Sequence, residues 1–294
     1  MGRKNTVDQS RTTNRQRNQS GNLRMGDGAM TGDYVEFDMA DGVATLALNR
    51  PEKYNAYVPE MGEALLRYLE EVRERDDVRC VVLEGRGDAF SAGGDVDVMS
   101  DRLDTEVVAI AQAERLSEGP HTLVERLFRL PVPTVAKVDG LAVGAGASLA
   151  IACDVLLASD RTRIGFGFRQ VGLSVDSGVS YLLTRLVGPN VAKELIYTGE
   201  LVDADRAVEI GLFNHMFDVE EFEDEVDAFV RTITDGPTRA FRQSKRLIDN
   251  AQHQHLESAL RNEAVAQGAV MDTSEHREGV RSFREDRDPQ FHGE

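Results

Sequence analysis

Two glycine-rich loops contain the residues whose types and spacing best suit chemistry. The first is Phe90-Ser91-Ala92-Gly93-Gly94-Asp95, and the second is Gly140-Leu141-Ala142-Val143-Gly144-Ala145-Gly146-Ala147. Each follows an apolar, strand-like run and leaves small residues whose backbone N–H groups no side chain covers. Two N–H donors aimed at one point can stabilise a developing oxyanion, which is the main electrostatic need of acyl-thioester chemistry. Gly94 and Ala145 are therefore the candidate oxyanion donors.

Such chemistry also needs a group that transfers a proton near the α-carbon of the thioester. Asp176 is the best candidate, because it follows an apolar stretch that contains Phe166 and Phe168 and precedes a helix expected from about Ser177. The alternative is that Asp176 only caps the N-terminus of that helix. The sequence leaves both interpretations open.

A nucleotide cofactor is not expected. Gly144 and Gly146 resemble the start of a dinucleotide fingerprint, but Leu149 stands in place of its third glycine, and Asp160 is too near to be its ribose-binding acid. Ser91 is not expected to be a nucleophile, because no histidine lies at a suggestive position.

The sequence predicts no metal site. His253 and His255 lack surrounding carboxylates, and no CxxC motif or Cys/His cluster occurs. The two cysteines, Cys80 and Cys153, lie in apolar runs and are expected to pack as small hydrophobic residues in a reducing compartment, which favours a cytoplasmic location.

The composition is strongly acidic, with a net charge of −17 from 51 acidic and 34 basic residues, only five of which are lysine. Such a surface repels nucleic acid and anionic membranes, and no long uncharged apolar run is present. We interpret the acidity and scarce lysine as adaptation to high salt, where screening relieves self-repulsion. A merely acidic, arginine-rich protein is the alternative.

Residues 1–29 differ from the rest of the chain, because they are polar and carry six basic residues against two acidic ones. This segment is expected to be a disordered basic tail or to precede the true start at Met25 or Met30. It lacks the apolar region of a secretory signal.

From Tyr34 the pattern becomes regular. Paired strands are expected at 35–39 and 43–49, a helix at 59–75, and buried strands at 80–84, 134–138 and 155–158. Further helices are expected around 121–130 and from 147, and the last hundred residues are mainly helical, around 177–187, 190–198, 203–210, 219–233, 237–252, 256–271 and 274–285. The alternation of strands and helices predicts an α/β fold with right-handed crossovers.

The chain resembles the crotonase superfamily, the enoyl-CoA hydratases and isomerases, over residues 34–292. The motifs that carry the resemblance are Leu48–Ala56, Ala89–Asp95, Ala136–Asp154, Gly172–Val187, Arg277–Phe283 and Pro289–Phe291. The resemblance implies a spiral of repeated β-β-α turns in a core at 30–215, a helical trimerisation region at 216–294, and a homotrimer or hexamer. It also implies an acyl-CoA thioester as substrate, with no separate cofactor.

The same resemblance places Gly94 and Ala145 on the two oxyanion donors of the family. It implies substrate binding by residues of three segments, namely Lys53, Tyr54 and Ala56, then Ala92, Gly93, Asp95, Val96 and Asp97, and finally Gly144, Ser148 and Phe168.

Departures from the family pattern bear on the reaction. The two catalytic glutamates of hydratases fall on Ser148 and Phe168 here, so neither position holds a carboxylate. Asp176 falls on an acidic position that some isomerases and dehalogenases of the family use, and the run from Gly172 to Val187 looks most like isomerases of phenylacetate degradation, although Val175 replaces a usual proline and Val179 a usual glycine.

The expected activity is therefore an enoyl-CoA isomerase of fatty-acid or aromatic-acid catabolism. Two alternatives stay open, an enoyl-CoA hydratase and a non-catalytic relative that binds CoA or RNA. The basic tail favours RNA binding, but the remaining residues carry a net charge of −21.

Overall fold

A β-hairpin begins the part of the chain that the computed structural model describes, residues 34–103 and 108–293. Strands β1 (Val35–Ala40) and β2 (Val43–Leu48) pair antiparallel around Asp41 and Gly42, whose φ angles are 49° and 79°. Two successive residues with positive φ form the turn whose twist matches that of the flanking strands. The predicted hairpin is confirmed.

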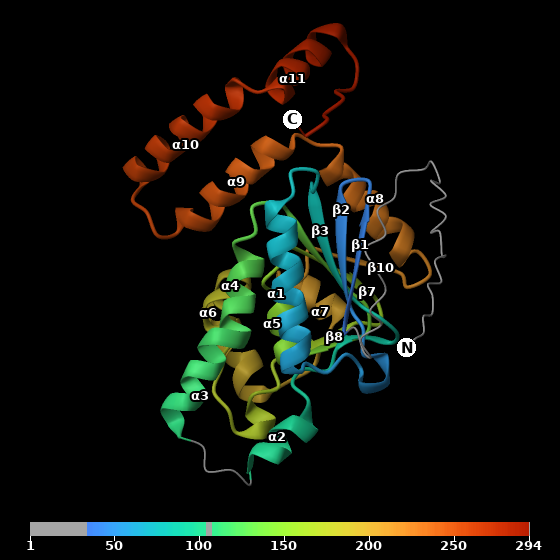
Figure 1. Ribbon diagram of the computed structural model, residues 1–294, viewed down its shortest axis with the longest axis vertical. Helices are drawn as coiled ribbons and strands as arrows, with labels where there is room; N and C mark the ends of the chain where they lie inside the picture. Colours follow the sequence, from blue (N-terminus) through green and yellow to red (C-terminus); the bar gives the residue numbers. More distant parts are fainter. Residues whose placement is uncertain (1–33, 104–107, 294) are drawn as a thin grey trace, which may run out of the picture. The chain divides into compact units, whose positions relative to one another are not determined.

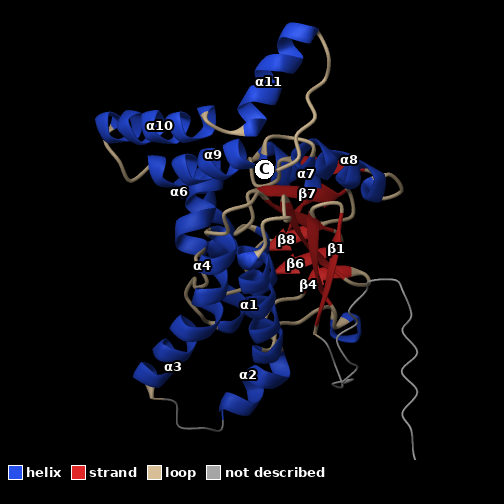
Figure 2. Cartoon of the chain, turned by 45° about the horizontal axis from the view of Figure 1, so that its top comes forward, coloured by secondary structure: helices blue, strands red, loops and turns tan. Residues whose placement is uncertain are grey.

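The larger sheet continues with strands that all run parallel to β2. Its order is β1-β2-β3-β5-β7-β10, where β3 is Cys80–Gly85, β5 is Thr134–Val138, β7 is Val155–Ser159 and β10 is His215–Phe217. Strands β3, β5 and β7 are apolar and largely buried, as expected for a parallel sheet covered on both faces. In Figure 2 the strands are drawn red and lie together, with α1 and α4 along one side.

Alternate residues of each strand point to opposite faces, and each face has its own helices. On one face Val81, Leu83 and Ala136 pack in a core with residues of α1 (Pro59–Glu74) and α4 (Thr122–Phe128). On the other face Val82 and Val135 pack against α8 (Phe222–Thr234). Figure 1 shows α1 and α4 beside each other, and α8 packs against β3 and β7.

A second, smaller sheet supports the two glycine loops. Its order is β4-β6-β8-β9, where β4 is Ala89–Ser91, β6 is Leu141–Val143, β8 is Arg163–Gly165 and β9 is Val202–Asp203. Strands β4, β6 and β8 each follow a strand of the larger sheet, which gives the repeat of two strands that the resemblance implied. Because β4 and β6 are parallel neighbours, the loops after Ser91 and Val143 emerge at the same edge.

The remaining helices and turns are α2 (Val96–Leu103), α3 (Ala109–Leu116), α5 (Ala145–Ala150), α6 (Val179–Thr198), α7 (Ala204–Glu209), α9 (Thr238–Ala251), α10 (Leu256–Met271), α11 (Ser274–Glu285), and the 3₁₀ turns Pro51–Lys53 and Arg169–Val171. The two helices expected at 177–187 and 190–198 are the halves of α6, which is kinked at Gly188 before Pro189. Proline cannot continue the helical hydrogen bonding, so the kink follows from the sequence.

One helical segment was predicted too short. The helix expected at about 121–130 is preceded by α3 and by a π-helical turn, Ser117–His121, that contains Pro120. A π-turn shifts the hydrogen bonding by one residue, and such turns are frequent at functional sites. Gly119 and Pro120 interrupt the helical pattern in the sequence.

The C-terminal helices connect to the sheet through Arg79, which precedes β3. Its guanidinium donates hydrogen bonds to Thr238 Oγ1 at 2.8 Å and to the carbonyl oxygens of Gly236 at 2.6 Å and Phe291 at 3.0 Å. The boundary predicted between 215 and 216 falls within β10, and the boundary itself stays a prediction. The tail at 1–29 lies outside the described residues. Among the described residues, no helix is long and apolar enough to cross a membrane.

Candidate active site

The two glycine loops contact each other where they leave the smaller sheet. Gly93 has a φ of 92°, and a Cβ atom on it would lie 2.7 Å from the carbonyl oxygen of Val143 and 3.7 Å from the nitrogen of Ala145. A Cβ on Gly146 would lie 2.6 Å from that of Ser91. Only glycine permits both the positive φ and this close approach, so the small residues bring the second loop against the first.

The N–H groups of Gly94 and Ala145 donate no hydrogen bond to any described residue, whereas the N–H groups beside them are occupied. Asp95 N donates to Tyr57 O at 3.0 Å, and Gly144 N donates to Gly165 O at 2.9 Å. Gly94 and Ala145 line one cavity of about 1020 Å³. The free amides are therefore available to an acceptor that enters this cavity.

Asp176 lines the same cavity, together with Phe166, Phe168 and Leu173. Its carboxylate makes no hydrogen bond or ion pair with any described residue. Helix α6 begins at Val179, two residues later than expected, and its N-cap is Gly178 without a side-chain hydrogen bond. The capping interpretation of Asp176 is therefore wrong, and its carboxylate is free to act on a ligand.

The residues expected to bind substrate fall into two groups. Those that line the cavity are Ala92, Gly93, Asp95, Val96, Gly144 and Phe168, whereas Lys53, Tyr54, Ala56, Asp97 and Ser148 do not line it. Lys53 Nζ forms an ion pair with Asp97 at 2.9 Å near the first loop, and the two side chains are largely exposed. Ser148 is fully buried and donates its hydroxyl to Gly144 O at 2.9 Å, which fixes the second loop. Substrate binding by these residues stays a prediction.

Asp95 holds the end of the first loop instead of facing the ligand with a free carboxylate. Arg50 donates to its Oδ2 at 2.5 Å, and the N–H of Asp97 donates to its Oδ1 at 2.8 Å. The hydrogen bond from Arg50 is the main reason that the pKa of Asp95 lies below its usual value. Asp95 is thus a charged anchor directly after the free amide of Gly94.

The side chains of Asn55 and Ser91 hold the first glycine loop in place through hydrogen bonds. The buried amide of Asn55 donates to Arg86 O and Ala89 O at 2.9 and 2.8 Å. The Ser91 hydroxyl donates to Asn55 O at 2.7 Å and accepts the N–H of Gly93 at 3.3 Å. Ser91 is therefore a structural residue, which agrees with the sequence argument against a serine nucleophile.

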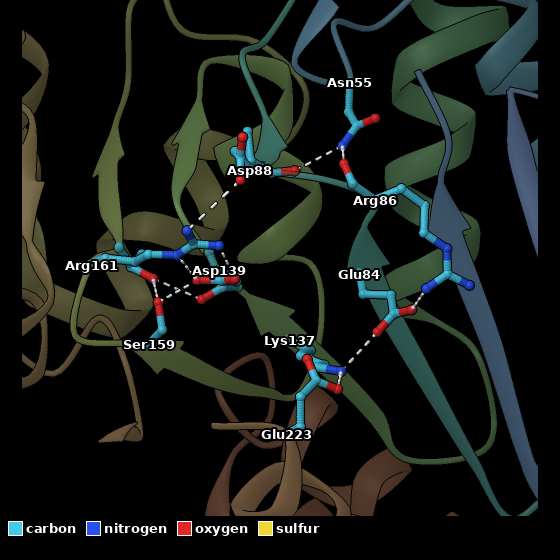
Figure 3. A network of polar contacts seen from close by, with 12 residues as sticks. Asn55, Glu84, Arg86, Asp88, Lys137, Asp139, Ser159, Arg161 and Glu223 are labelled. Carbon is cyan, nitrogen blue, oxygen red and sulfur yellow. Dashed lines mark hydrogen bonds and ion pairs between the residues drawn. The ribbon is translucent and has the colours of Figure 1, made fainter. Parts of the chain in front are cut away.

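A polar network secures the turns that lead into both loops (Figure 3). Arg161 donates to both carboxylate oxygens of Asp139, at 2.6 and 2.5 Å, and its guanidinium lies 3.9 Å from Asp88. Ser159 also donates to Asp139, at 2.6 Å. Because Asp88 precedes β4 and Asp139 precedes β6, Arg161 lies between the two turns that lead into the glycine loops.

Asp139 should make the stability of the protein depend on pH. Burial alone would raise its pKa, but the hydrogen bonds from Arg161 and Ser159 outweigh burial and lower it. A carboxyl whose pKa is lowered by folding stabilises the fold above its unfolded pKa of about 3.9, and this contribution is lost as the pH falls through the folded value. We expect Asp139→Asn to lower the free energy of unfolding by about 1–2 kcal/mol at pH 7 and by less at pH 3.5.

Urea unfolding of the wild type and of Asp139→Asn at pH 7 and pH 3.5 measures this loss of unfolding free energy. Asp88→Asn is the matched control, because the Asp88 side chain is 86% exposed and should contribute little. If Asp139→Asn lowers the free energy of unfolding equally at both pH values, the role assigned to the Asp139 carboxylate is contradicted.

The described residues contain no group of three or more His, Cys, Asp or Glu side chains that could hold a metal ion. Cys80 and Cys153 are free and buried. Burial raises the pKa of Cys80 to about 12, and it raises that of Cys153 as well, so neither thiol is a ready nucleophile.

Sequence reasoning missed several residues of the cavity wall. Tyr57, Gly62 and Glu63 line it from the start of α1 and the residues before it, and Met99, Gly119 and Pro120 line it from α2 and the π-turn. No chemical pattern marks these residues in the sequence. The one available signal was the position of Tyr57, two residues after the buried Asn55 and directly after the selected motif Leu48–Ala56.

Comparison with known proteins agrees with this arrangement. Residues 38–294 match the sequence profile of the enoyl-CoA hydratase/isomerase family. The chain belongs to this family. The predicted membership of the crotonase superfamily is thereby confirmed.

Relatives of different activity match almost end to end. The chain is 33% identical to the 1,2-epoxyphenylacetyl-CoA isomerase of Escherichia coli over 262 residues, which cover 89% of this chain and 99% of that protein. It is 32% identical to the trans-2-decenoyl-[acyl-carrier-protein] isomerase of Streptococcus mutans over 259 residues, 88% of this chain and 98% of that protein. A crystal structure of an enoyl-CoA hydratase from Bacillus anthracis superposes with a TM-score of 0.82 at 30% identity and covers 89% of this chain and all of that one.

The structural match confirms the predicted fold class. It also means that members of the enoyl-CoA hydratase/isomerase family with hydratase and isomerase names share this fold, so the side chains in the cavity must decide between the reactions.

Proposed function

We propose that this family member is an enoyl-CoA isomerase that moves a double bond with a single acid–base residue. Asp176 removes a proton from C2 of a 3-enoyl thioester, and the N–H groups of Gly94 and Ala145 stabilise the dienolate oxygen. The proton returns at C4. One C–H bond breaks and one forms, the double bond moves from C3–C4 to C2–C3, and no atom is gained or lost.

The observation that carries this proposal is the free carboxylate of Asp176 in the same cavity as two free amides. Hydration would need a second proton-transfer group, because one group must activate water while another protonates carbon. The positions that the resemblance assigns to the two glutamates of hydratases hold Ser148, whose hydroxyl is engaged by Gly144 O, and Phe168.

Other carboxylates in the cavity wall suit this role less well. Glu63, Glu114 and Glu118 line the cavity, but they are exposed, whereas Asp176 is half-buried. The names of the two isomerase relatives support the proposal, whereas the hydratase in the structural comparison keeps hydration as the alternative to be tested.

The direct test is to compare two substrates with the purified protein. We expect 3-hexenoyl-CoA to be converted to 2-hexenoyl-CoA with a kcat/KM at least about a hundredfold higher than that for hydration of 2-hexenoyl-CoA. The mass of the product separates the reactions, because hydration adds one water. A faster hydration of 2-hexenoyl-CoA would overturn the proposed isomerase.

The π-turn should limit the size of the acyl group. A Cβ atom on Gly119 would meet no atom within 4 Å, so this position borders open cavity space. We expect Gly119→Leu to lower kcat/KM for a long acyl thioester such as 3-dodecenoyl-CoA about tenfold or more, because the side chain occupies the volume of several methylene groups.

The control for Gly119→Leu is 3-butenoyl-CoA, whose kcat/KM should change less than about twofold. The variant should also fold at least as well as the wild type, because leucine favours helical structure over glycine by roughly 1 kcal/mol. An equal loss for both thioesters would place Gly119 outside the acyl site.

We further propose that the C-terminal helices pack against other copies of the chain, as the resemblance implies for a trimer or hexamer. Large apolar side chains on α10 and α11 are exposed, including Leu256, Val265 and Phe283, the last at 88%. Such an apolar surface favours association. The absence of a separate cofactor, the cytoplasmic location and the adaptation to high salt stay predictions.

A further inference from the structure

We propose that the Tyr57 hydroxyl donates a hydrogen bond to the substrate. It thereby selects acyl groups that carry an oxygen on the chain, such as a hydroxyl or carbonyl. This inference rests on the proposed function only in taking an acyl thioester as the ligand. It assigns a specificity residue that neither the catalytic positions nor the family resemblance includes.

The backbone of Tyr57 fixes the residue beside the oxyanion loop. Its N–H donates to Gly93 O at 2.6 Å and its carbonyl accepts the N–H of Asp95 at 3.0 Å, so the two hydrogen bonds flank Gly94. The hydroxyl therefore lies no further than the length of one tyrosine side chain from the backbone segment that presents the free N–H of Gly94. A group on the acyl chain, close to the thioester, is within its reach.

The side chain of Tyr57 is directed over the first turns of α1. A Cβ atom on Gly62 would lie only 2.2 Å from the Tyr57 hydroxyl oxygen and 3.0 Å from the ring carbon that bears it. Glycine within a helix costs roughly 1 kcal/mol relative to alanine. Gly62 thus gives up helical stability at a position where a methyl group would displace the phenol.

The Tyr57 hydroxyl has no hydrogen-bond partner among the described residues, although it lies in the cavity wall. Burial, with a smaller contribution from the charge of Glu63, raises the pKa of this phenol to about 12. The group is therefore a neutral O–H donor at any physiological pH. Tyrosine hydroxyls in apolar surroundings normally find a partner, and a ligand oxygen would supply it here.

The surrounding wall makes this donor selective. The side chains of Leu66, Leu123 and Val124 line the same cavity and are apolar, whereas Glu63, whose charge acts on the phenol, is exposed. A hydrocarbon acyl group would cover the phenol and leave its donor unpaired, which costs free energy, whereas an oxygen at the right carbon would accept from it. The site should therefore prefer an oxygenated chain over its hydrocarbon analogue.

The test measures binding of saturated thioesters, so that no turnover is needed. Calorimetric titration compares hexanoyl-CoA with 3-, 4-, 5- and 6-hydroxyhexanoyl-CoA on the wild type and on Tyr57→Phe. We expect at least one hydroxylated thioester to bind the wild type about tenfold more tightly than hexanoyl-CoA, and this preference to vanish in Tyr57→Phe. Hexanoyl-CoA itself should bind both proteins equally or slightly favour the variant.

Two further variants make the result specific. Tyr197→Phe removes a hydroxyl from a side chain that is 70% exposed and outside the cavity, and it should keep the preference. Gly62→Ala should reduce the preference without removing any hydroxyl, because the methyl group displaces the phenol.

The outcomes separate this inference from the proposed function. Tyr57 does not select the acyl group if the wild type binds hexanoyl-CoA and shows no preference for any hydroxylated chain, or if Tyr57→Phe keeps that preference. Neither result affects the isomerase proposal. If no thioester binds, both proposals fall.

Discussion

Asp176→Asn is expected to lower the turnover of a 3-enoyl thioester at least about a hundredfold. Asparagine keeps the size and polarity of the side chain but cannot take a proton from C2. The Asp176 carboxylate forms no hydrogen bond or ion pair with any described residue, so the substitution breaks no such interaction that supports the fold. The loss should therefore appear in kcat, with little change in the affinity for thioesters.

Stopped-flow kinetics with 3-hexenoyl-CoA and titration with hexanoyl-CoA measure the two quantities separately. Asp160→Asn is a suitable control, because it removes the same charge from an exposed residue that does not line the cavity. Turnover of Asp176→Asn within threefold of the wild type would show that another group moves the proton.

Ala145→Pro is expected to lower kcat/KM by about a hundredfold to a thousandfold, because proline has no N–H and removes one of the two oxyanion donors. The position tolerates the backbone of proline well. Ala145 is the first residue of α5, where proline fits the helix, and Gly144 before it has φ 51° and ψ −115°, outside the helical region that proline disfavours in its predecessor.

Ala145→Gly is the control, since it also changes the side chain at this position but keeps the N–H, and its kcat/KM should fall less than about threefold. Circular dichroism and thermal unfolding verify that both variants fold. If Ala145→Pro folds and keeps more than a third of the wild-type kcat/KM, the Ala145 amide does not stabilise the reacting oxygen.

The fold was largely predictable because its strong signals are local. The turn at Asp41 and Gly42, the apolar strand that begins at Cys80 and the break at Gly188 and Pro189 each follow from backbone preferences of a few residues. The smaller sheet escaped this reasoning, since β4, β6 and β8 have only three residues each and are too short to show a period of two.

The glycine loops and Asp176 were predictable for a different reason. Glycine at positions such as Gly93 is required by a positive φ, so the sequence shows where the backbone is exposed to a ligand. Whether Asp176 caps a helix depends on whether the first turn starts at Ser177 or Val179, and sequence patterns do not resolve a shift of two residues.

The cavity wall could not be predicted from periodicity. Tyr57 and Gly119 face the same space from segments that lie about sixty residues apart, and only the tertiary structure brings them together. Their residue types are common in cores and turns, so nothing in the sequence marks them as ligand-facing.

The most direct test of a single-carboxylate isomerase follows the proton itself. In this test, deuterium replaces both hydrogens on C2 of 3-hexenoyl-CoA, and the wild-type protein converts this substrate in ordinary water. The product is analysed by NMR and mass spectrometry. The mechanism predicts 2-hexenoyl-CoA with deuterium at C4, carried there by the Asp176 carboxyl. A product that has gained water, or deuterium transfer to C4 that persists unchanged in Asp176→Asn, would contradict it.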